Sequence, residues 1–188
     1  MNTHPIITKP SAEEYPEWFA SEIEPVPYND LIGGLEDSFS QTIVFLQQLS
    51  GEDIVYRYAP GKWSIKQIWQ HITDVERVLC YRALRYARQD ATVLSGFDEN
   101  KYADASGADE RNFDAILREY AAVRKATLEL FNSFTADMFM HRGTAGKSNM
   151  TVRSVGYLML GHEIHHIHTI KRTLFQEVRI INIGFIQL

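Results

Sequence analysis

The sequence predicts an all-α protein built around a four-helix bundle. Four segments of about 20 residues carry apolar side chains at helical spacing and contain no proline. Five of the six prolines fall within the first 27 residues, where they disfavour long helices. Four amphipathic helices of this length bury their apolar stripes best against one another. We therefore expect an extended N-terminal arm over residues 1–27, the bundle over 28–175 and an apolar C-terminal tail over 176–188.

The first predicted helix spans about residues 29–49, and Asn29 or Asp30 is suited to cap it. Gly33 and Gly34 lie in its first turn and weaken it there.

The other three helices have clearer starts. The second spans about residues 64–88, and Ser64 followed by Gln67 matches a capping box. The third spans about 112–134, and the fourth spans about 151–175 behind a threonine suited to cap it. A long polar segment joins the second helix to the third, and a glycine-containing break joins the third to the fourth.

The tail, QEVRIINIGFIQL, carries no charge after Arg179. We expect it to form a strand or a buried extended arm, because an exposed apolar segment promotes association. It would pack on the bundle or on a second copy of the chain, which favours a homodimer.

Composition excludes several classes of function. The net charge is 19 − 24 = −5, so the chain has no general electrostatic attraction for nucleic acid. No uncharged apolar run approaches the ~18 residues of a membrane span, and the first residues do not resemble a signal peptide. A single cysteine, Cys80, excludes an intrachain disulfide and a thiolate-rich metal cluster. We expect a cytoplasmic protein with neither nucleic-acid nor membrane partners.

Four of the seven histidines lie in the stretch GHEIHHIH of the fourth helix. His162 and His166 are four residues apart, so they project from one face about 6 Å apart along the axis. This pair continues the apolar face of the helix, where imidazole rings need polar partners. A divalent metal ion is the simplest partner that both rings could share. Solvated or supporting positions are expected for His165 and His168.

His71 is the candidate for a third ligand, because it flanks the apolar stripe of the second helix between Ile68 and Val75. Three histidines would leave a coordination position open for water or substrate. The alternative is a hydrogen-bonded core histidine. Asp74 is placed to orient the ring of His71. Trp69 and Tyr157 are expected to line the pocket.

Two short motifs are weaker. Residues 162–166 match H-E-x-x-H, the zinc-protease pattern, but Glu163 lies about 100° around the helix from His162 and points sideways. No downstream domain would complete a protease cleft. Residues 146–148 (GKS) lack the earlier glycine and the preceding strand of a phosphate loop.

Two histidine-bearing stretches resemble a known family. Residues 60–76 (PGKWSIKQIWQHITDVE) are similar to the second-helix signature of the DinB-like superfamily. Residues 151–155 and 161–166 resemble its fourth-helix signature, and Phe97-Asp98-Glu99 is similar to a recurring feature of its long loop. The likeness covers roughly residues 30–174.

This resemblance implies a bundle of the up-down-down-up type and a divalent metal, zinc or nickel, held by His71, His162 and His166. Members of the family include thiol-dependent S-transferases that use bacillithiol or mycothiol, a mycothiol-dependent isomerase and metal-dependent hydrolases. They are commonly dimers.

Three functional hypotheses follow. The first is a metal-dependent transferase in which a low-molecular-weight thiol attacks a small electrophilic substrate. The second is a metal-dependent hydrolase, which a carboxylate beside the open metal position would favour. The third is a metal-stabilised binding protein without turnover, which a coordination sphere closed by protein ligands would favour. Cationic groups in the pocket would favour the first hypothesis.

Overall fold

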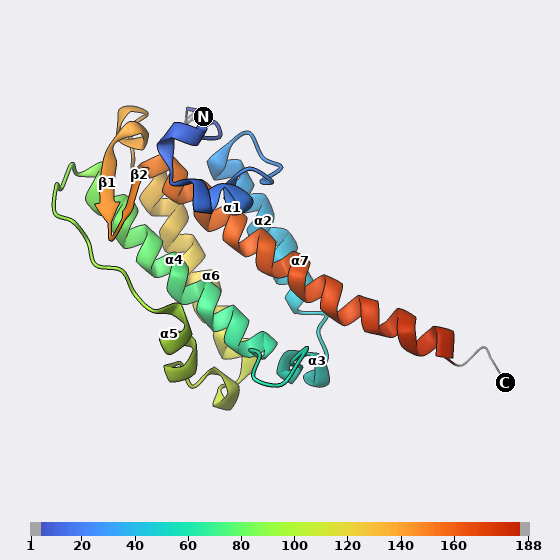
Figure 1. The fold of residues 1–188 in the computed structure, drawn as a ribbon. Helices are drawn as coiled ribbons and strands as arrows, with labels where there is room; N and C mark the ends of the chain where they lie inside the picture. Colours follow the sequence, from blue (N-terminus) through green and yellow to red (C-terminus); the bar gives the residue numbers. More distant parts are fainter. Residues whose placement is uncertain (1–4, 185–188) are drawn as a thin grey trace.

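The computed structural model describes the backbone of residues 5–184 and the side chains of residues 5–174. Four long helices form a bundle (Figure 1), which confirms the predicted all-α fold. They are α2 (Leu31–Leu46), α4 (Ile65–Ala87), α6 (Phe113–Asn132) and α7 (Val152–Gly184). Among the described helices, none offers an apolar stretch long enough to cross a membrane.

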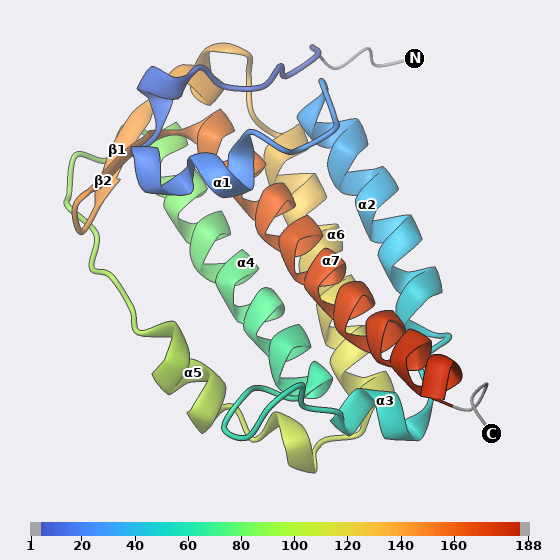
Figure 2. The same ribbon diagram turned by 45° about the vertical axis from the view of Figure 1, so that its right-hand side comes forward.

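The helices pack in the cyclic order α2, α6, α4, α7, so that α2 and α4 lie on one diagonal and α6 and α7 on the other. Figure 2 shows α4 and α6 running in one direction and α2 and α7 in the opposite direction. This is the predicted up-down-down-up arrangement. It brings α4 directly against α7, and these two helices carry the candidate metal ligands.

Polar side chains cap the helix starts as expected. Asp30, not Asn29, caps α2, where its Oδ2 accepts from the amide of Gly33 at 3.0 Å. Ser64 Oγ accepts from the amide of Gln67 at 3.1 Å, and the Gln67 side chain accepts from the amide of Ser64 at 3.1 Å. This reciprocal pair is the capping box that begins α4. A threonine, Thr151, precedes α7, and its hydroxyl accepts from the amide of Ser154 at 3.2 Å.

Short helices occupy the connections. α3 (Gly51–Val55) lies between α2 and α4. The long segment between α4 and α6 holds α5 (Glu99–Ala105) and the 3-10 helix η3 (Ala108–Glu110). Asp98 caps α5 by accepting from the amide of Lys101 at 3.1 Å.

The break between α6 and α7 contains a β-hairpin that sequence periodicity did not predict. After the 3-10 helix η4 (Asp137–Met140), strands β1 (Arg142–Ala145) and β2 (Ser148–Thr151) pair antiparallel. Gly146 in the turn has φ +58°, a conformation that favours glycine. Four-residue strands are too short to show a clear two-residue period.

The N-terminal arm is extended apart from η1 (Ala12–Glu14), η2 (Glu17–Phe19) and α1 (Ala20–Ile23), as predicted. It lies across the first half of α7 (Figure 2) and buries Ile23 against it. Gly161 of α7 permits this approach, because a Cβ there would lie 2.0 Å from the carbonyl oxygen of Glu22.

The expected strand or extended arm in the tail is wrong for residues 176–184, because α7 continues to Gly184. Each further helical residue adds a backbone hydrogen bond, and the segment contains no proline to interrupt the helix. Residues 185–188 lie outside the described residues. A homodimer formed through the tail stays a prediction.

A buried cation joins the four bundle helices at their centre. Arg124 of α6 is fully buried, and its Nε and Nη2 donate to the two carboxylate oxygens of Glu76 on α4, each at 2.9 Å. Its Nη2 also pairs with Glu163 of α7, and its Nη1 donates to the carbonyl of Leu35 on α2 at 3.2 Å. Glu76 is therefore a buried ion-pair partner.

Glu163 completes this network. Its Oε1 accepts from the hydroxyls of Ser38 at 2.6 Å and Thr42 at 3.0 Å, and its Oε2 accepts from Tyr120 at 2.7 Å. Glu163 points into the bundle centre, away from the histidine face of α7. This agrees with its predicted sideways direction and disfavours the protease interpretation of residues 162–166.

We expect Arg124→Met to lower the free energy of unfolding by about 3–5 kcal/mol, because it leaves two buried carboxylates without their cation. Urea denaturation measures the change. Arg77→Met is the matched control, since Arg77 pairs with Asp74 and Glu119 while 46% exposed. Its loss should cost no more than about 1 kcal/mol. Equal effects of the two substitutions would contradict the assigned role of Arg124.

Candidate metal centre

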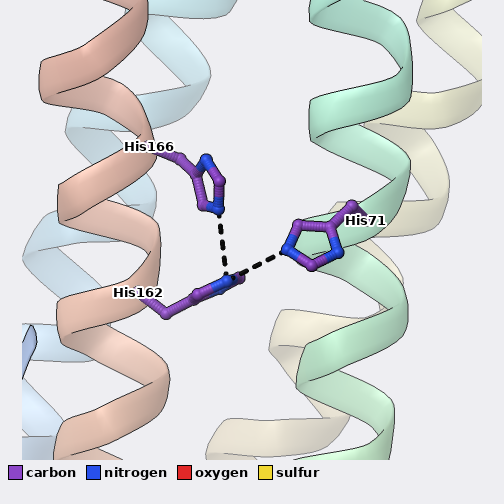
Figure 3. A group of neighbouring side chains, drawn as sticks. All are labelled: His71, His162 and His166. Carbon is purple, nitrogen blue, oxygen red and sulfur yellow. Dashed lines mark hydrogen bonds between the residues drawn. The ribbon is translucent and has the colours of Figure 1, made fainter. Parts of the chain in front are cut away.

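Three imidazole rings converge between α4 and α7 (Figure 3). His71 projects from α4, and His162 and His166 project from successive turns of α7. The Nε2 of His162 lies 3.1 Å from the Nε2 of His71 and 3.2 Å from the Nε2 of His166. Ligand nitrogens of all three rings lie within 4.8 Å of one another. The structure thus brings together the three histidines that the sequence singled out.

The donor set fits a divalent cation. A tetrahedral ion with metal–nitrogen bonds of about 2.0–2.1 Å separates two ligand nitrogens by roughly 3.3 Å, close to the two spacings found here. A neutral imidazole nitrogen carries at most one proton, so the Nε2 of His162 cannot donate to both neighbours. A cation among the three rings would give each nitrogen lone pair a partner.

The surroundings keep these rings neutral. Burial lowers the pKa of His71 to about 4. Burial, with repulsion from the neighbouring histidines, lowers the pKa of His166 to about 3. The same causes hold the pKa of His162 well below its ordinary value. Metal ions bind the neutral form of imidazole, so the site requires no proton release near pH 7.

A cavity of about 530 Å³ reaches the three rings. Apolar side chains of α4 and α7 form its floor, and the arm, the segment before α5 and the tip of the β-hairpin supply its other walls. Its apolar lining includes Phe19, Val75, Leu79, Phe97 and Leu158, and its charged lining comprises Glu22, Arg82, Glu99 and Lys147. The three imidazole rings therefore lie at a space that a small molecule can enter.

Trp63 belongs to the same wall. Its ring centroid lies 4.8 Å from that of His71, at an interplanar angle of 44°. This contact holds one face of the His71 ring. His165 is exposed and also lines the cavity, whereas His168 is exposed and does not.

Glu22 is a cavity residue that sequence reasoning missed. Its Oε2 is buried without a hydrogen-bond partner, and burial, with the nearby charge of Glu99, raises its pKa to about 7. Glu22 lies in the proline-rich arm, where no periodicity or motif marks it. Only the packing of the arm at Gly161 brings it to the cavity.

Three sequence expectations about the site are wrong. Trp69 and Tyr157 do not line the cavity, because both are fully buried: Trp69 packs edge-on against Tyr120, and the Tyr157 hydroxyl donates to the carbonyl of Ile7 at 3.0 Å. Asp74 does not orient His71. It accepts instead from Gln70 at 3.0 Å and from Arg77 at 3.2 Å. Trp69 and Asp74 thus lie on other faces of α4 than His71.

Comparison with known proteins agrees with this architecture. The family model of the DinB superfamily matches residues 35–170, which cover most of the chain and all three histidines. The protein belongs to the DinB superfamily. A search of curated proteins gave no match.

Two solved structures share the fold. YfiT from Bacillus subtilis, described as a probable metal-dependent hydrolase with an unusual four-helix bundle topology, has a TM-score of 0.66 and 17% identity. That similarity covers 77% of this chain and 85% of YfiT. The mycothiol-dependent maleylpyruvate isomerase has a TM-score of 0.61 and 13% identity over 72% of this chain. The match spans 57% of the isomerase.

The depressed histidine pKa values predict a pH dependence. An unfolded histidine takes up a proton near pH 6.5, whereas His71 resists protonation until about pH 4. The free energy of unfolding of metal-free protein should therefore fall as the pH drops from 6.5 toward 4, by up to about 1.4 kcal/mol per pH unit for each such histidine. Urea denaturation between pH 7 and pH 5 measures this slope, which His71→Leu should reduce. A His71 ring that titrates near pH 6.5 by NMR would contradict it.

Proposed function

We propose that this protein is a metal-dependent enzyme in which His71, His162 and His166 bind one divalent ion, zinc or nickel. The observation that carries the proposal is the convergence of three neutral imidazole nitrogens on a cavity wall. Within the described residues, this group contains no fourth histidine, cysteine or carboxylate. Such an ion would keep at least one position for a small molecule, which disfavours a purely structural metal.

The preferred nucleophile is a low-molecular-weight thiol that attacks a small electrophilic substrate. When bound, the ion would lower the pKa of a coordinated thiol or water and so supply a nucleophile near neutral pH. Cationic Arg82 and Lys147 line the cavity, as expected for a site that receives an anionic thiol or substrate. The apolar floor at Val75 and Leu79 would keep water from the reacting groups.

A second candidate is hydrolysis, and Glu22 is the observation that favours it. Its unpartnered carboxylate oxygen and its pKa of about 7 suit a group that accepts a proton from an attacking water molecule. The sequence alone nominated no such carboxylate. Both candidates use the same three ligands and differ in the nucleophile.

We expect His162→Ala to abolish stoichiometric binding of zinc or nickel, because the Nε2 of His162 lies beside those of both other ligands. His168→Ala is the matched control on an exposed position of α7, and it should retain full metal content. Elemental analysis of purified protein gives the result. Equal metal content in the two variants would contradict the ligand assignment.

Spectra of cobalt-substituted protein distinguish a thiol from water as the nucleophile. Titration with glutathione, as a low-molecular-weight thiol, should produce a sulfur-to-cobalt charge-transfer band that saturates at one thiol per site. An unchanged spectrum at saturating thiol, together with hydrolysis of p-nitrophenyl acetate, would replace the transferase by the hydrolase. In that case Glu22→Gln should lower the hydrolysis rate by about 10²–10⁴-fold.

A further inference from the structure

Arg82 is a half-buried cation without an anionic partner. It projects from α4 into the cavity, and among the described side chains its guanidinium makes no ion pair or hydrogen bond. Its close neighbour is the ring of Phe97, whose centroid lies 5.7 Å from the guanidinium carbon. A ring at this position holds the face of the guanidinium and leaves its N–H donors free at the edge.

This arrangement contrasts with half of the chain's arginines. Six of them pair with described carboxylates: Arg57, Arg77, Arg85, Arg111, Arg124 and Arg153. The chain carries an excess of acidic residues, so counter-ions are plentiful. A partly desolvated arginine left unpaired inside a cavity is therefore a site prepared for an anion.

Arg82 lies on the same face of α4 as His71. The two residues are 11 positions apart, which corresponds to about 20° around the helix and about 16 Å along it. Val75 and Leu79 lie between them on this face, and both line the cavity. The cavity therefore has imidazole nitrogens at one end, an apolar middle and a guanidinium at the other.

The cavity has two carboxylates, Glu22 and Glu99, and two cations, Arg82 and Lys147. Glu22 packs at Gly161, next to His162, and it interacts electrostatically with Glu99. Lys147 lies at the hairpin tip, which is tied to the segment before Phe97 by a hydrogen bond from the amide of Gly146 to the carbonyl of Leu94 at 2.8 Å. Lys147 therefore lies beside the segment that carries Phe97, and neither cavity carboxylate pairs with Arg82.

We propose that Arg82 is the anchor for a carboxylate or phosphate group of an elongated ligand whose apolar part lies along Val75, Leu79 and Leu158. Its free N–H donors fit the two oxygens of such a group. The ligand places its other end at the three histidines, a distance of about 16 Å or less along α4. The reaction of this far end at the histidines rests on the proposed metal-dependent function, whereas the anchor at Arg82 does not.

Metal-free protein tests the anchor by itself. Calorimetric titration should show that octanoate binds at least about tenfold more tightly than 1-octanol, because a charge-assisted contact favours the acid. Arg82→Gln should remove this preference. Arg82→Lys should retain part of it, since lysine keeps the charge but lacks the paired N–H donors of a guanidinium. Arg118→Gln, on an exposed position of α6, is the matched control and should bind like the wild type.

Three outcomes would contradict the proposed role of Arg82. They are equal binding of octanoate and 1-octanol, no binding of octanoate, and a preference for octanoate that survives in Arg82→Gln. Arg82→Lys keeps the test decisive if Arg82→Gln does not fold. If Arg82→Lys preferred octanoate as strongly as the wild type does, the paired N–H donors of the guanidinium would not be the basis of the preference.

Cobalt-loaded protein then separates this proposal from the metal-dependent function. We expect 8-mercaptooctanoate to generate the charge-transfer band at concentrations at least about tenfold lower than 8-mercaptooctanol does. Selective octanoate binding without any cobalt binding would support the anchor and refute the metal centre. If the charge-transfer band appears with equal affinity for 8-mercaptooctanoate and 8-mercaptooctanol, the result would support the metal centre and refute the anchor.

Discussion

The ion-pair network around Arg124 is the constraint on which the rest of the structure depends. The guanidinium of Arg124 stays charged, so its burial in the bundle requires both Glu76 and Glu163 beside it, and α4, α6 and α7 have little freedom to slide past one another. Glu76 follows His71 by five residues, and Glu163 follows His162 directly. The contacts that fix the two carboxylates therefore also fix the level at which the imidazole rings meet.

Adjacent residues of α7 do different work because a helix turns by about 100° per residue. His162 faces the cavity with His166, while Glu163 faces the bundle centre and accepts hydrogen bonds from Ser38, Thr42 and Tyr120. The letters H-E-x-x-H alone do not distinguish this arrangement from a protease site. The direction of Glu163 does, because a buried carboxylate paired with arginine is unavailable as a base for a substrate at the histidines.

Local sequence patterns were sufficient to predict much of the fold. Periodicity located the four helices, side-chain caps located their starts, and a four-residue spacing paired His162 with His166. The hairpin, the burial of Glu76 and the position of Glu22 depend on contacts between distant segments, and no local pattern encodes them. Arg82 was within reach of the sequence, because its position on the face of His71 follows from helical geometry, but its lack of a partner appears only in three dimensions.

The residues that line the cavity come from two kinds of structure, the bundle helices and the segments that connect or precede them. The histidines and Arg82 lie on bundle helices, whose packing is set by the buried core, while Glu22, Phe97 and Lys147 lie on the arm, the crossover segment and the hairpin. Changes in these connections can alter the cavity without moving the imidazole nitrogens of the three histidines, since the Arg124 network holds the helices independently. Connections vary more readily than packed helices, so one bundle architecture can hold different cavities. The two solved structures that share this fold, at 17% and 13% identity, are described as a probable metal-dependent hydrolase and as a mycothiol-dependent maleylpyruvate isomerase.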